Sequence, residues 1–308
     1  MKEFNEKPFG ILSITNDVEE IPYGLDLIKA HDVWETSKKG EGVVIAVMDT
    51  GCDFNHPDLE GAIIGGHNFT DDDDSDVNNY MDYRGHGTHV SGIIAARENK
   101  IGVIGVAPRS KLLILKTINK NGKGSYKNVI NAIKYAIDWK GPNGETVSII
   151  NMSLGGTLHD EELYETIKEA RKKGILLVVA AGNDGDGKDD TIEISYPGFY
   201  QEVIQVGSIN EDLSLSSFSN TNINLDFVAP GGMIYSTFLN GQYAKLSGTS
   251  MATPYVAGSL ALILNLMPAV FEHNPTVKSF MAYSYLVDHA KRLGLSALEE
   301  GNGLIQLV

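Results

Sequence analysis

The sequence predicts an α/β fold, a single domain with a mainly parallel central sheet flanked by helices. Short runs rich in Val, Ile and Leu alternate with longer stretches of helical periodicity, which is the pattern of βαβ units. Glycine supplies 33 of 308 residues, which indicates many tight turns between such units. No internal repeat and no Pro- or Ser-rich linker interrupts residues 20–308. We therefore expect one domain over residues 19–308, preceded by a polar segment, residues 1–18.

Five apolar runs are expected to be buried strands, each ending at polar or glycine residues. They are Val43–Met48, Leu112–Lys116, Ser148–Met152, Ile175–Ala180 and Val203–Val206. Helices are expected between them, over Tyr126–Trp139 and Asp160–Lys173. The second begins with acidic residues and ends with basic ones before Gly174, as the helix dipole and C-cap favour. Val256–Met267 is expected to lie in a buried helix.

Composition and charge exclude several classes of protein. A single cysteine cannot form an intrachain disulfide, so the chain is not a disulfide-stapled secreted scaffold. A net charge of −15 disfavours binding to nucleic acid or to anionic membranes. No apolar run reaches the roughly 18 residues that a bilayer span needs, and the N-terminus lacks the apolar core of a secretory signal. We therefore expect a cytoplasmic protein without nucleic-acid or membrane partners.

Candidate catalytic residues follow the expected strands or begin the expected helices. In open parallel sheets, active groups lie beyond the carboxyl ends of the strands. Asp49 follows the first strand and Asn183 the fourth, while His86 and Ser250 lie at helix starts. An acid, a histidine, an amide and a serine together are the set that acyl transfer requires.

Other interpretations of these residues are weaker. Asp49 alone could simply form a turn, and Asp49–Gly51 also matches aspartic proteases, which need a second such motif that only a homodimer could supply here. His86 and His89 could hold a metal, yet the zinc-protease pattern lacks its glutamate. Ser250 alone could be an ordinary N-cap. No Gly-x-Gly-x-x-Gly follows a strand, which argues against a nucleotide-binding protein. We take His86 as the base and His89 as structural.

Several segments together resemble the subtilisin-like serine proteases. Asp49–Gly51, His86–Val90 and Gly248–Pro254 match the three signatures of that family in its order, with gaps of 37 residues (49 to 86) and 164 residues (86 to 250). Ala181–Asn183 and Asn151–Gly156 match its oxyanion and substrate-binding segments. Residues 138–144 and 182–187 are similar to segments of the bacterial intracellular subtilisins. The resemblance covers the chain from about residue 21 to its end.

The resemblance implies a serine endopeptidase that acts on proteins and peptides. Ser250 would be the nucleophile, His86 the general base and Asp49 its orienting acid, with the Asn183 amide stabilising the oxyanion. An extended substrate would lie between two strands, as in β-augmentation. The expected substrate-binding residues are Gly122 and Gly124 on one side, and Ser153, Leu154, Gly155 and Ser195 on the other.

The resemblance also implies Ca²⁺ as a cofactor. The ligands expected for a first site are Asp58, Arg97, Asn99, Ile101 and Val103, and those for a second site are Gly198, Tyr200, Val203 and Asp226. Carboxylate, amide and carbonyl oxygens suit this hard cation. Ordinary surface loops remain the alternative at both places. The acidic run at Asp71–Asp74 and Asp76 is expected to be a solvated loop, since it lacks EF-hand spacing.

The N-terminal segment, residues 1–18, is expected to be an inhibitory extension. Lys7, Pro8 and Phe9 resemble the end of an inhibitory motif of the intracellular branch, in which such an extension lies across the active cleft. Cleavage between about Asn16 and Glu20 would then activate the enzyme. A disordered tail is the alternative. The same branch includes homodimers, so a homodimer is possible here.

Overall fold

A parallel β-sheet forms the centre of the molecule. The computed structural model describes residues 2–5, 14–15, 21–188, 191–267 and 274–308. Within them, seven strands form one sheet in the order β10-β9-β8-β7-β3-β5-β4, and every neighbouring pair is parallel. The strands are β3 (Val44–Asp49), β4 (Ile63–Asn68), β5 (Lys111–Lys116), β7 (Val147–Met152), β8 (Leu176–Ala180), β9 (Ile204–Ile209) and β10 (Phe227–Pro230). The expected single α/β domain with a parallel sheet is confirmed.

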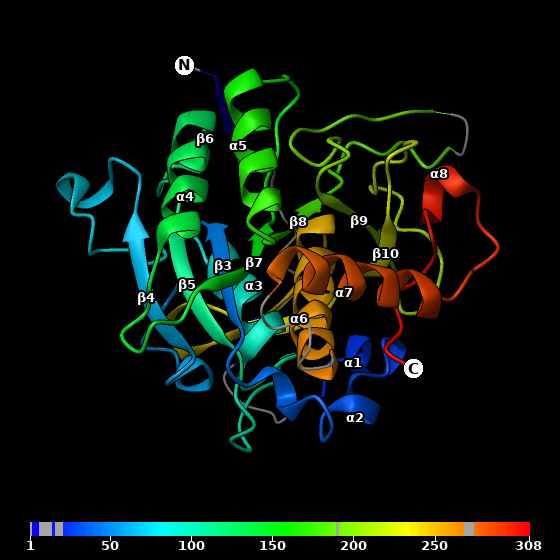
Figure 1. Ribbon diagram of the computed structural model, residues 1–308, viewed down its shortest axis with the longest axis horizontal. Helices are drawn as coiled ribbons and strands as arrows, with labels where there is room; N and C mark the ends of the chain where they lie inside the picture. The colour runs from blue at the N-terminus through cyan, green and yellow to red at the C-terminus, as the bar shows by residue number, and fades with distance from the viewer. Residues whose placement is uncertain (1, 6–13, 16–20, 189–190, 268–273) are drawn as a thin grey trace.

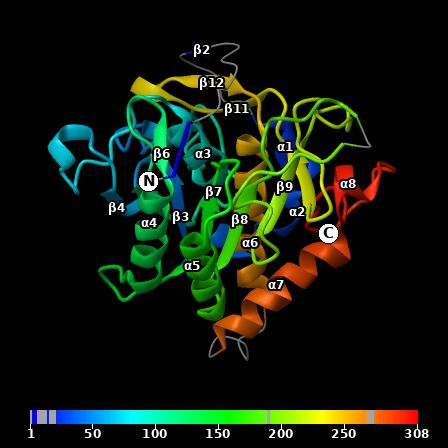
Figure 2. The same cartoon turned by 90° about the horizontal axis from the view of Figure 1, so that it is seen from above.

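Helices cover both faces of this sheet (Figures 1 and 2). Helices α4 (Tyr126–Asp138) and α5 (Glu161–Lys172) pack together on one face, and α3 (His86–Ala95) and α6 (Thr249–Leu266) on the other. A further helix, α7 (Pro275–His289), packs against α6. Alternate residues of β3 enter the two cores: Ile45 and Val47 face α3 and α6, whereas Val44, Ala46 and Met48 face α4 and α5.

The five expected strands are all present, with ends that differ by up to three residues. Strands β4 and β10 were not expected from the sequence. In β4, two glycines and a histidine dilute the apolar signal, and β10 has only four residues. Helix α6 begins at Thr249, which confirms the expected helix start around Ser250, and it contains the apolar run expected from residue 256 onward.

Two small antiparallel sheets and several short helices complete the described part of the chain. Strand β1 (Glu3–Asn5) pairs with β6 (Lys123–Ser125), and β12 (Tyr243–Leu246) pairs with β11 (Ile234–Thr237) and β2 (Ile14–Thr15). The short helices are α1 (Tyr23–Leu27), α2 (Ala30–Val33), α8 (Ala297–Glu300), and the 3₁₀ turns η1 (Lys38–Gly40), η2 (Pro57–Leu59), η3 (Asp72–Ser75) and η4 (Leu239–Gly241).

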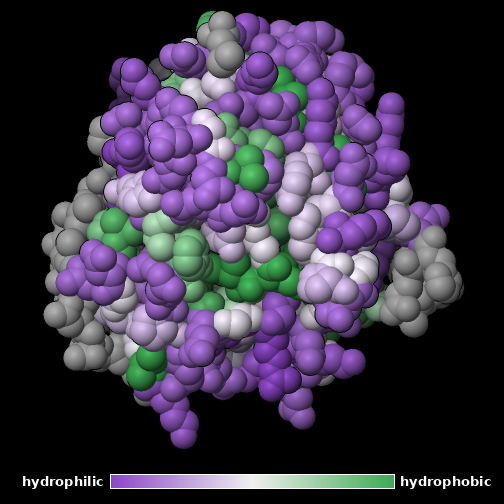
Figure 3. Space-filling model, turned by 90° about the vertical axis from the view of Figure 1, so that its left-hand side faces the viewer, coloured by the Kyte–Doolittle hydropathy of each residue, from purple (hydrophilic) through white to green (hydrophobic). Residues whose placement is uncertain are grey.

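The outer surface beside the edge strand β4 is mostly hydrophilic. Figure 3 looks onto the left-hand side of Figure 1, where β4 lies, and shows polar side chains around a central apolar strip. None of the helices in the described ranges combines the length and hydropathy that a bilayer span requires.

Candidate active site

Asp49 and His86 meet at the carboxyl end of β3. Asp49 is the last residue of that strand and His86 the first residue of α3, and both are buried, at 1% and 2% exposure. The Nδ1 atom of His86 lies 2.7 Å from Oδ1 of Asp49, which also accepts the Thr50 N–H at 2.7 Å. When Nδ1 carries the proton shared with the carboxylate, Nε2 of a neutral imidazole is left as a proton acceptor. The contact therefore sets the tautomer that a general base needs.

Close backbone approach explains the glycine that follows His86. A Cβ atom on Gly87 would overlap the carbonyl oxygen of Gly51, in the turn after Asp49. Only glycine lets the first turn of α3 come this near to the end of β3. The spacing between the histidine and the carboxylate thus depends on a residue without a side chain.

Ser250 is the second residue of α6, where backbone N–H groups are not used by the helix. Its hydroxyl donates to the carbonyl of Ser153 at 3.2 Å. In return, the Ser153 hydroxyl donates to the carbonyl of Ser250 at 2.9 Å. That carbonyl lacks the usual helical partner because the residue four positions later is Pro254, which has no N–H. The proline therefore leaves an acceptor that ties the start of α6 to the segment after β7.

Asn183 follows β8 and is oriented by Thr249. Its Oδ1 accepts both the backbone N–H and the hydroxyl of Thr249, each at 2.9 Å. With the oxygen fixed in this way, the Nδ2 group is the part of the amide that remains to donate to another oxygen. Sequence reasoning did not single out Thr249; the signal that could have found it is a hydroxyl residue directly before the candidate nucleophile.

One pocket gathers nearly all of these groups. It brings together residues from the ends of β7 and β8 and the starts of α3 and α6. Of the expected substrate-binding residues, Ser153, Leu154, Gly155 and Ser195 line it. Gly122 directly precedes β6 and Gly124 lies in β6, and neither lines the pocket. The lining residues are Phe4, Asn5, His86, Ile118, Ser153, Leu154, Gly155, Ala180, Gly182, Asn183, Ser195, Thr249 and Ser250.

The N-terminal strand β1 contributes Phe4 and Asn5 to the lining of this pocket. It pairs with β6, near the end marked N in Figure 2. Its Phe4 pairs with Gly124 of β6, is 7% exposed, and lies so close that a Cβ on Gly124 would overlap its ring. The ring centroids of Phe4 and Tyr126 are 5.8 Å apart. Lys2 adds an ion pair of 3.1 Å with Asp160. Phe4 was missed from the sequence, although a single apolar residue between Glu3 and Asn5 fits an edge strand. Lys7, Pro8 and Phe9 lie outside the described residues.

The loop after α3 surrounds a fully buried carboxylate. Asp58 accepts the Asn99 amide on Oδ1 and the Val103 N–H on Oδ2, both at 2.9 Å. Its own carbonyl accepts the Arg97 N–H at 2.8 Å, and Asn99 Oδ1 accepts the Ile101 N–H at 3.1 Å. Among the described ion pairs none involves Asp58, so no side-chain cation offsets its charge there. The expected ligands of the first site are thus brought together, but the groups that contact the carboxylate are N–H donors and not oxygen ligands.

Asp226, expected at a second metal site, has protein partners. Its carboxylate accepts the Gln205 N–H and the Tyr283 hydroxyl, both at 2.7 Å. Burial raises the pKa of this carboxyl to about 6. The same carboxylate and Val203 line a cavity that also contains Arg171, whose positive charge disfavours a metal ion. The other two expected ligands, Gly198 and Tyr200, do not line this cavity. Within the described residues, no cluster of three or more His, Cys, Asp or Glu side chains could hold a metal.

The acidic run at residues 71–76 differs from the solvated loop that was expected. Asp72 is buried, at 2% exposure, and its carboxylate contacts Lys116. Asp71, Asp74 and Asp76 are exposed, as expected. The prediction was wrong for Asp72 because the partner that makes its burial favourable lies 44 residues further along the chain, from 72 to 116.

Comparison with known proteins gives one consistent result. The family model described as "Subtilase family" matches residues 40–303. The chain is 51% identical over 300 residues to an intracellular serine protease of Paenibacillus polymyxa, covering 97% of this chain and 89% of that protein. It is 47% identical over 292 residues to the major intracellular serine protease of Bacillus subtilis (strain 168), covering 94% and 89%. It is 39% identical over 289 residues to a subtilisin of Bacillus pumilus, covering 94% and 98%.

Proposed function

The chain belongs to the subtilase family and is a serine endopeptidase acting on proteins and peptides, and from this premise we propose that Asp49, His86 and Ser250 form its catalytic triad. The observation that carries the proposal is the 2.7 Å contact between His86 Nδ1 and Asp49 Oδ1, with His86 and Ser250 in one pocket. The contact leaves His86 Nε2 to act on the hydroxyl that attacks the substrate.

The proposed reaction starts with a change of partner by the serine hydroxyl. Ser250 Oγ donates to the Ser153 carbonyl, so its O–H must turn toward His86 Nε2 before it attacks the scissile carbonyl. His86 then takes the proton, and the Asp49 carboxylate stabilises the imidazolium that forms. The same proton goes to the leaving amine when the tetrahedral intermediate breaks down. A water molecule repeats the sequence to release the acyl group.

The oxyanion of the intermediate has two proposed donors. One is the backbone N–H of Ser250 at the start of α6, where the helix dipole favours negative charge. The other is the Asn183 amide, whose orientation is fixed through its oxygen by Thr249. A donor held in place before the reaction does not need to reorganise as charge develops. Thr249 is thus proposed to act through Asn183.

Peptide substrates are proposed to bind as an added strand between β6 and the Ser153–Gly155 segment. The pairing of β1 with β6 supports this, because it shows that the β6 edge accepts an antiparallel strand. Ser195 and Gly155 would border the residue at the cut site, since both line the pocket next to Ser250.

The N-terminal segment is proposed to inhibit the enzyme until it is cleaved. Support comes from β1, which occupies the same β6 edge, buries Phe4 and is anchored by Lys2 on Asp160. A segment there excludes an extended substrate from the edge. We further propose that the enzyme works in the cytoplasm, as the names of two relatives, intracellular serine proteases, suggest.

Ca²⁺ is proposed to bind the loop after α3. The Asp58 carboxylate would hold it together with the Asn99 side-chain oxygen and the carbonyls of Arg97, Ile101 and Val103. For this the Asn99 amide must turn, because its NH₂ group now faces Asp58. The ion would stabilise the fold by neutralising a buried charge and takes no part in the chemistry.

A fluorophosphonate probe, which reacts with activated serines, tests the nucleophile and the extension together. We expect one labelled residue, Ser250, identified by peptide mass spectrometry. Phe4→Ala should label about 10- to 100-fold faster than the full-length parent, since burying a Phe side chain is worth about 1.5–3 kcal/mol. Glu3→Ala is the matched control, because Glu3 is exposed on the same strand, and should label at the parental rate. Labelling elsewhere would refute the triad, and equal rates in Phe4→Ala would refute the inhibition.

A further inference from the structure

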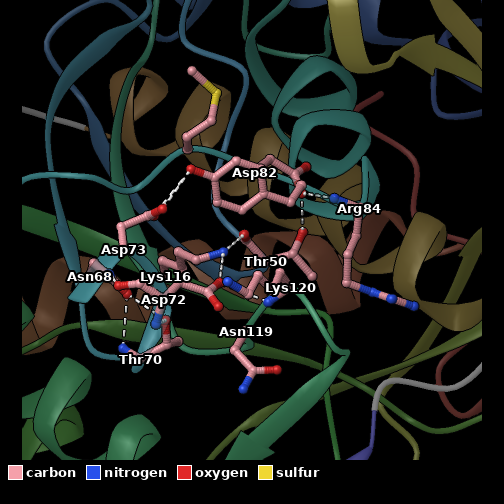
Figure 4. A network of polar contacts seen from close by, with 12 residues as sticks. Thr50, Asn68, Thr70, Asp72, Asp73, Asp82, Arg84, Lys116, Asn119 and Lys120 are labelled. Atoms are coloured by element: carbon pink, nitrogen blue, oxygen red, sulfur yellow. Dashed lines mark hydrogen bonds and ion pairs between the residues drawn. The ribbon is translucent and has the colours of Figure 1, made fainter. Parts of the chain in front are cut away.

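A buried ion pair lies behind the turn that carries Asp49, and the proposed mechanism does not use it. Lys116, the last residue of β5, and Asp72, the first residue of η3, are joined by an Nζ–Oδ2 distance of 3.1 Å. Their side chains are 0% and 2% exposed. Figure 4 shows the pair at the centre of a network of polar side chains. The cost of removing both charges from water can cancel their attraction, so the pair need not stabilise the fold. Its other contacts are therefore used to ask what it does.

Lys116 connects the pair to the catalytic turn. Its Nζ also donates to the carbonyl of Thr50 at 2.6 Å, and Thr50 directly follows Asp49. The Thr50 hydroxyl donates to Asp82 at 2.9 Å and accepts the N–H of Gly87 at 2.9 Å. The turn after β3 is therefore held through Thr50, whose carbonyl contacts the Lys116 ammonium group and whose hydroxyl contacts the first turn of α3.

Asp72 connects the same pair to the segment that leads into β6. Its Oδ2 accepts the backbone N–H of Lys120 at 2.7 Å. The neighbouring Asp71 accepts the Asn119 amide at 3.0 Å, and Asn119 Oδ1 accepts the Lys123 N–H at 3.1 Å. The turn at residues 119–123 thus takes its position from Asp71 and Asp72. Figure 4 shows Asp72 beside Lys120.

The loop that supplies Asp72 is itself well braced. Asn68, at the end of β4, accepts both the N–H and the hydroxyl of Thr70, at 2.8 and 2.7 Å. Its amide donates to the carbonyls of Asp72 and Asp76, both at 3.2 Å. Asp72 therefore projects from a fixed loop, and Lys116 from a central strand of the sheet. Because both side chains come from fixed segments, the pair can fix the position of the turn at residues 119–123 relative to Thr50.

We propose that Asp72 and Lys116 are positioning residues for extended substrates. Through Lys120 they set the distance of the β6 edge from the turn at Asp49 and Thr50, and hence the alignment of a bound strand with Ser250. The proposal rests on the proposed function, because it takes β6 as the substrate-binding edge. It also predicts that changing the pair lowers kcat/KM for long substrates and not for short ones. A substrate with one residue before the cut does not reach β6, whereas a tetrapeptide pairs with it.

The test compares two amide substrates with the same residue at the cut site and the same leaving group, one with a single residue and one with four. The measured quantity is kcat/KM for the four-residue substrate divided by kcat/KM for the single-residue substrate, both on the full-length chain. Parent and variants carry the same N-terminal segment, which competes with the four-residue substrate for the β6 edge, so the ratio of each variant is compared with the ratio of the parent. Asp72→Ala should lower the ratio about tenfold, as expected for the loss of one or two backbone hydrogen bonds, with the single-residue substrate little changed.

Two further variants make the result decisive. Lys116→Met combined with Asp72→Asn removes both charges at once, so no unpaired charge stays buried if Asp72→Ala fails to fold; this double variant should also lower the ratio. Asp74→Asn, on the same loop but exposed, is the matched control and should leave the ratio unchanged. A parental ratio in the folded Asp72 variants, or an equal loss on both substrates, would overturn the proposal alone. A parent enzyme with no preference for the tetrapeptide would overturn the β6 edge, and the proposal with it.

Discussion

Helix α3 carries two buried histidines, three residues apart, and they differ in what they can do. His86 faces the end of β3, where a carboxylate meets its Nδ1. His89, three residues later, faces β11 and β12, where its Nε2 lies 3.0 Å from the carbonyls of both Ile234 and Ala244. Burial lowers the pKa of His89 to about 3. Both side chains are shielded from water, so the type of partner, a charge or a neutral dipole, separates a proton acceptor from a structural residue.

Replacing His86 tests most directly whether it is the general base. His86→Ala should lower kcat about 10⁶-fold, the magnitude known from the corresponding knock-out in subtilisin, a member of the same family. The melting temperature should stay close to the parental value, because the mechanism and not the fold depends on the imidazole. Steady-state kinetics on a peptide amide and a thermal melt provide the two measurements. A His86→Ala enzyme with parental kcat would place the general base elsewhere.

His89 should control acid stability and leave the chemistry alone. In the unfolded chain its pKa is near 6.5, and in the folded chain about 3. Between these values the unfolded state binds a proton that the folded state does not, so stability is lost as pH falls through this window. The loss should reach about 4–5 kcal/mol near pH 3. His89→Gln, which keeps a donor for one of the two carbonyls, should lose that part of the pH dependence.

Urea unfolding of the parent and His89→Gln between pH 7 and pH 3 measures this difference. The two curves of unfolding free energy against pH should converge at low pH, with kcat of the variant near the parental value at neutral pH. Parallel curves would mean that His89 titrates normally in the folded protein. The distinction drawn between the two histidines from their partners would then fail.

Beyond the end of α3, the comparison extends to Asp58, a buried carboxylate that forms none of the ion pairs found among the described residues. If Ca²⁺ binds at Asp58, a chelator should lower the melting temperature by about 4 °C, corresponding to about 2.7 kcal/mol for an ion present at 100 times its Kd. Asp58→Asn should melt lower than the parent and be indifferent to both chelator and added Ca²⁺. Calorimetry of parent and variant, with and without chelator, gives the answer. A parent melt that chelation does not shift would contradict the calcium site.

The fold class, five of the strands and the positions of the candidate catalytic residues could be predicted from local sequence patterns. These features are local: a buried strand needs a continuous apolar run, and active groups in a parallel sheet follow the carboxyl ends of strands. Asp49, His86, Ser250 and Asn183 could therefore be selected from short segments. The strands β4 and β10 were missed because glycines or short length removed the same local signal.

Contacts between residues far apart in the sequence could not be predicted and became known from the folded structure. The burial of Asp72 depends on Lys116, the orientation of Asn183 on Thr249, and the burial of Phe4 on Gly124, whose missing Cβ leaves room for the ring. No local pattern reports such pairs, because each residue alone has an ordinary surface alternative. An aspartate in an acidic run is normally solvated, and it becomes buried here because the sheet brings a lysine to the same side. The physical reason is that burying a charge is favourable only with its partner in place, and the fold supplies that partner.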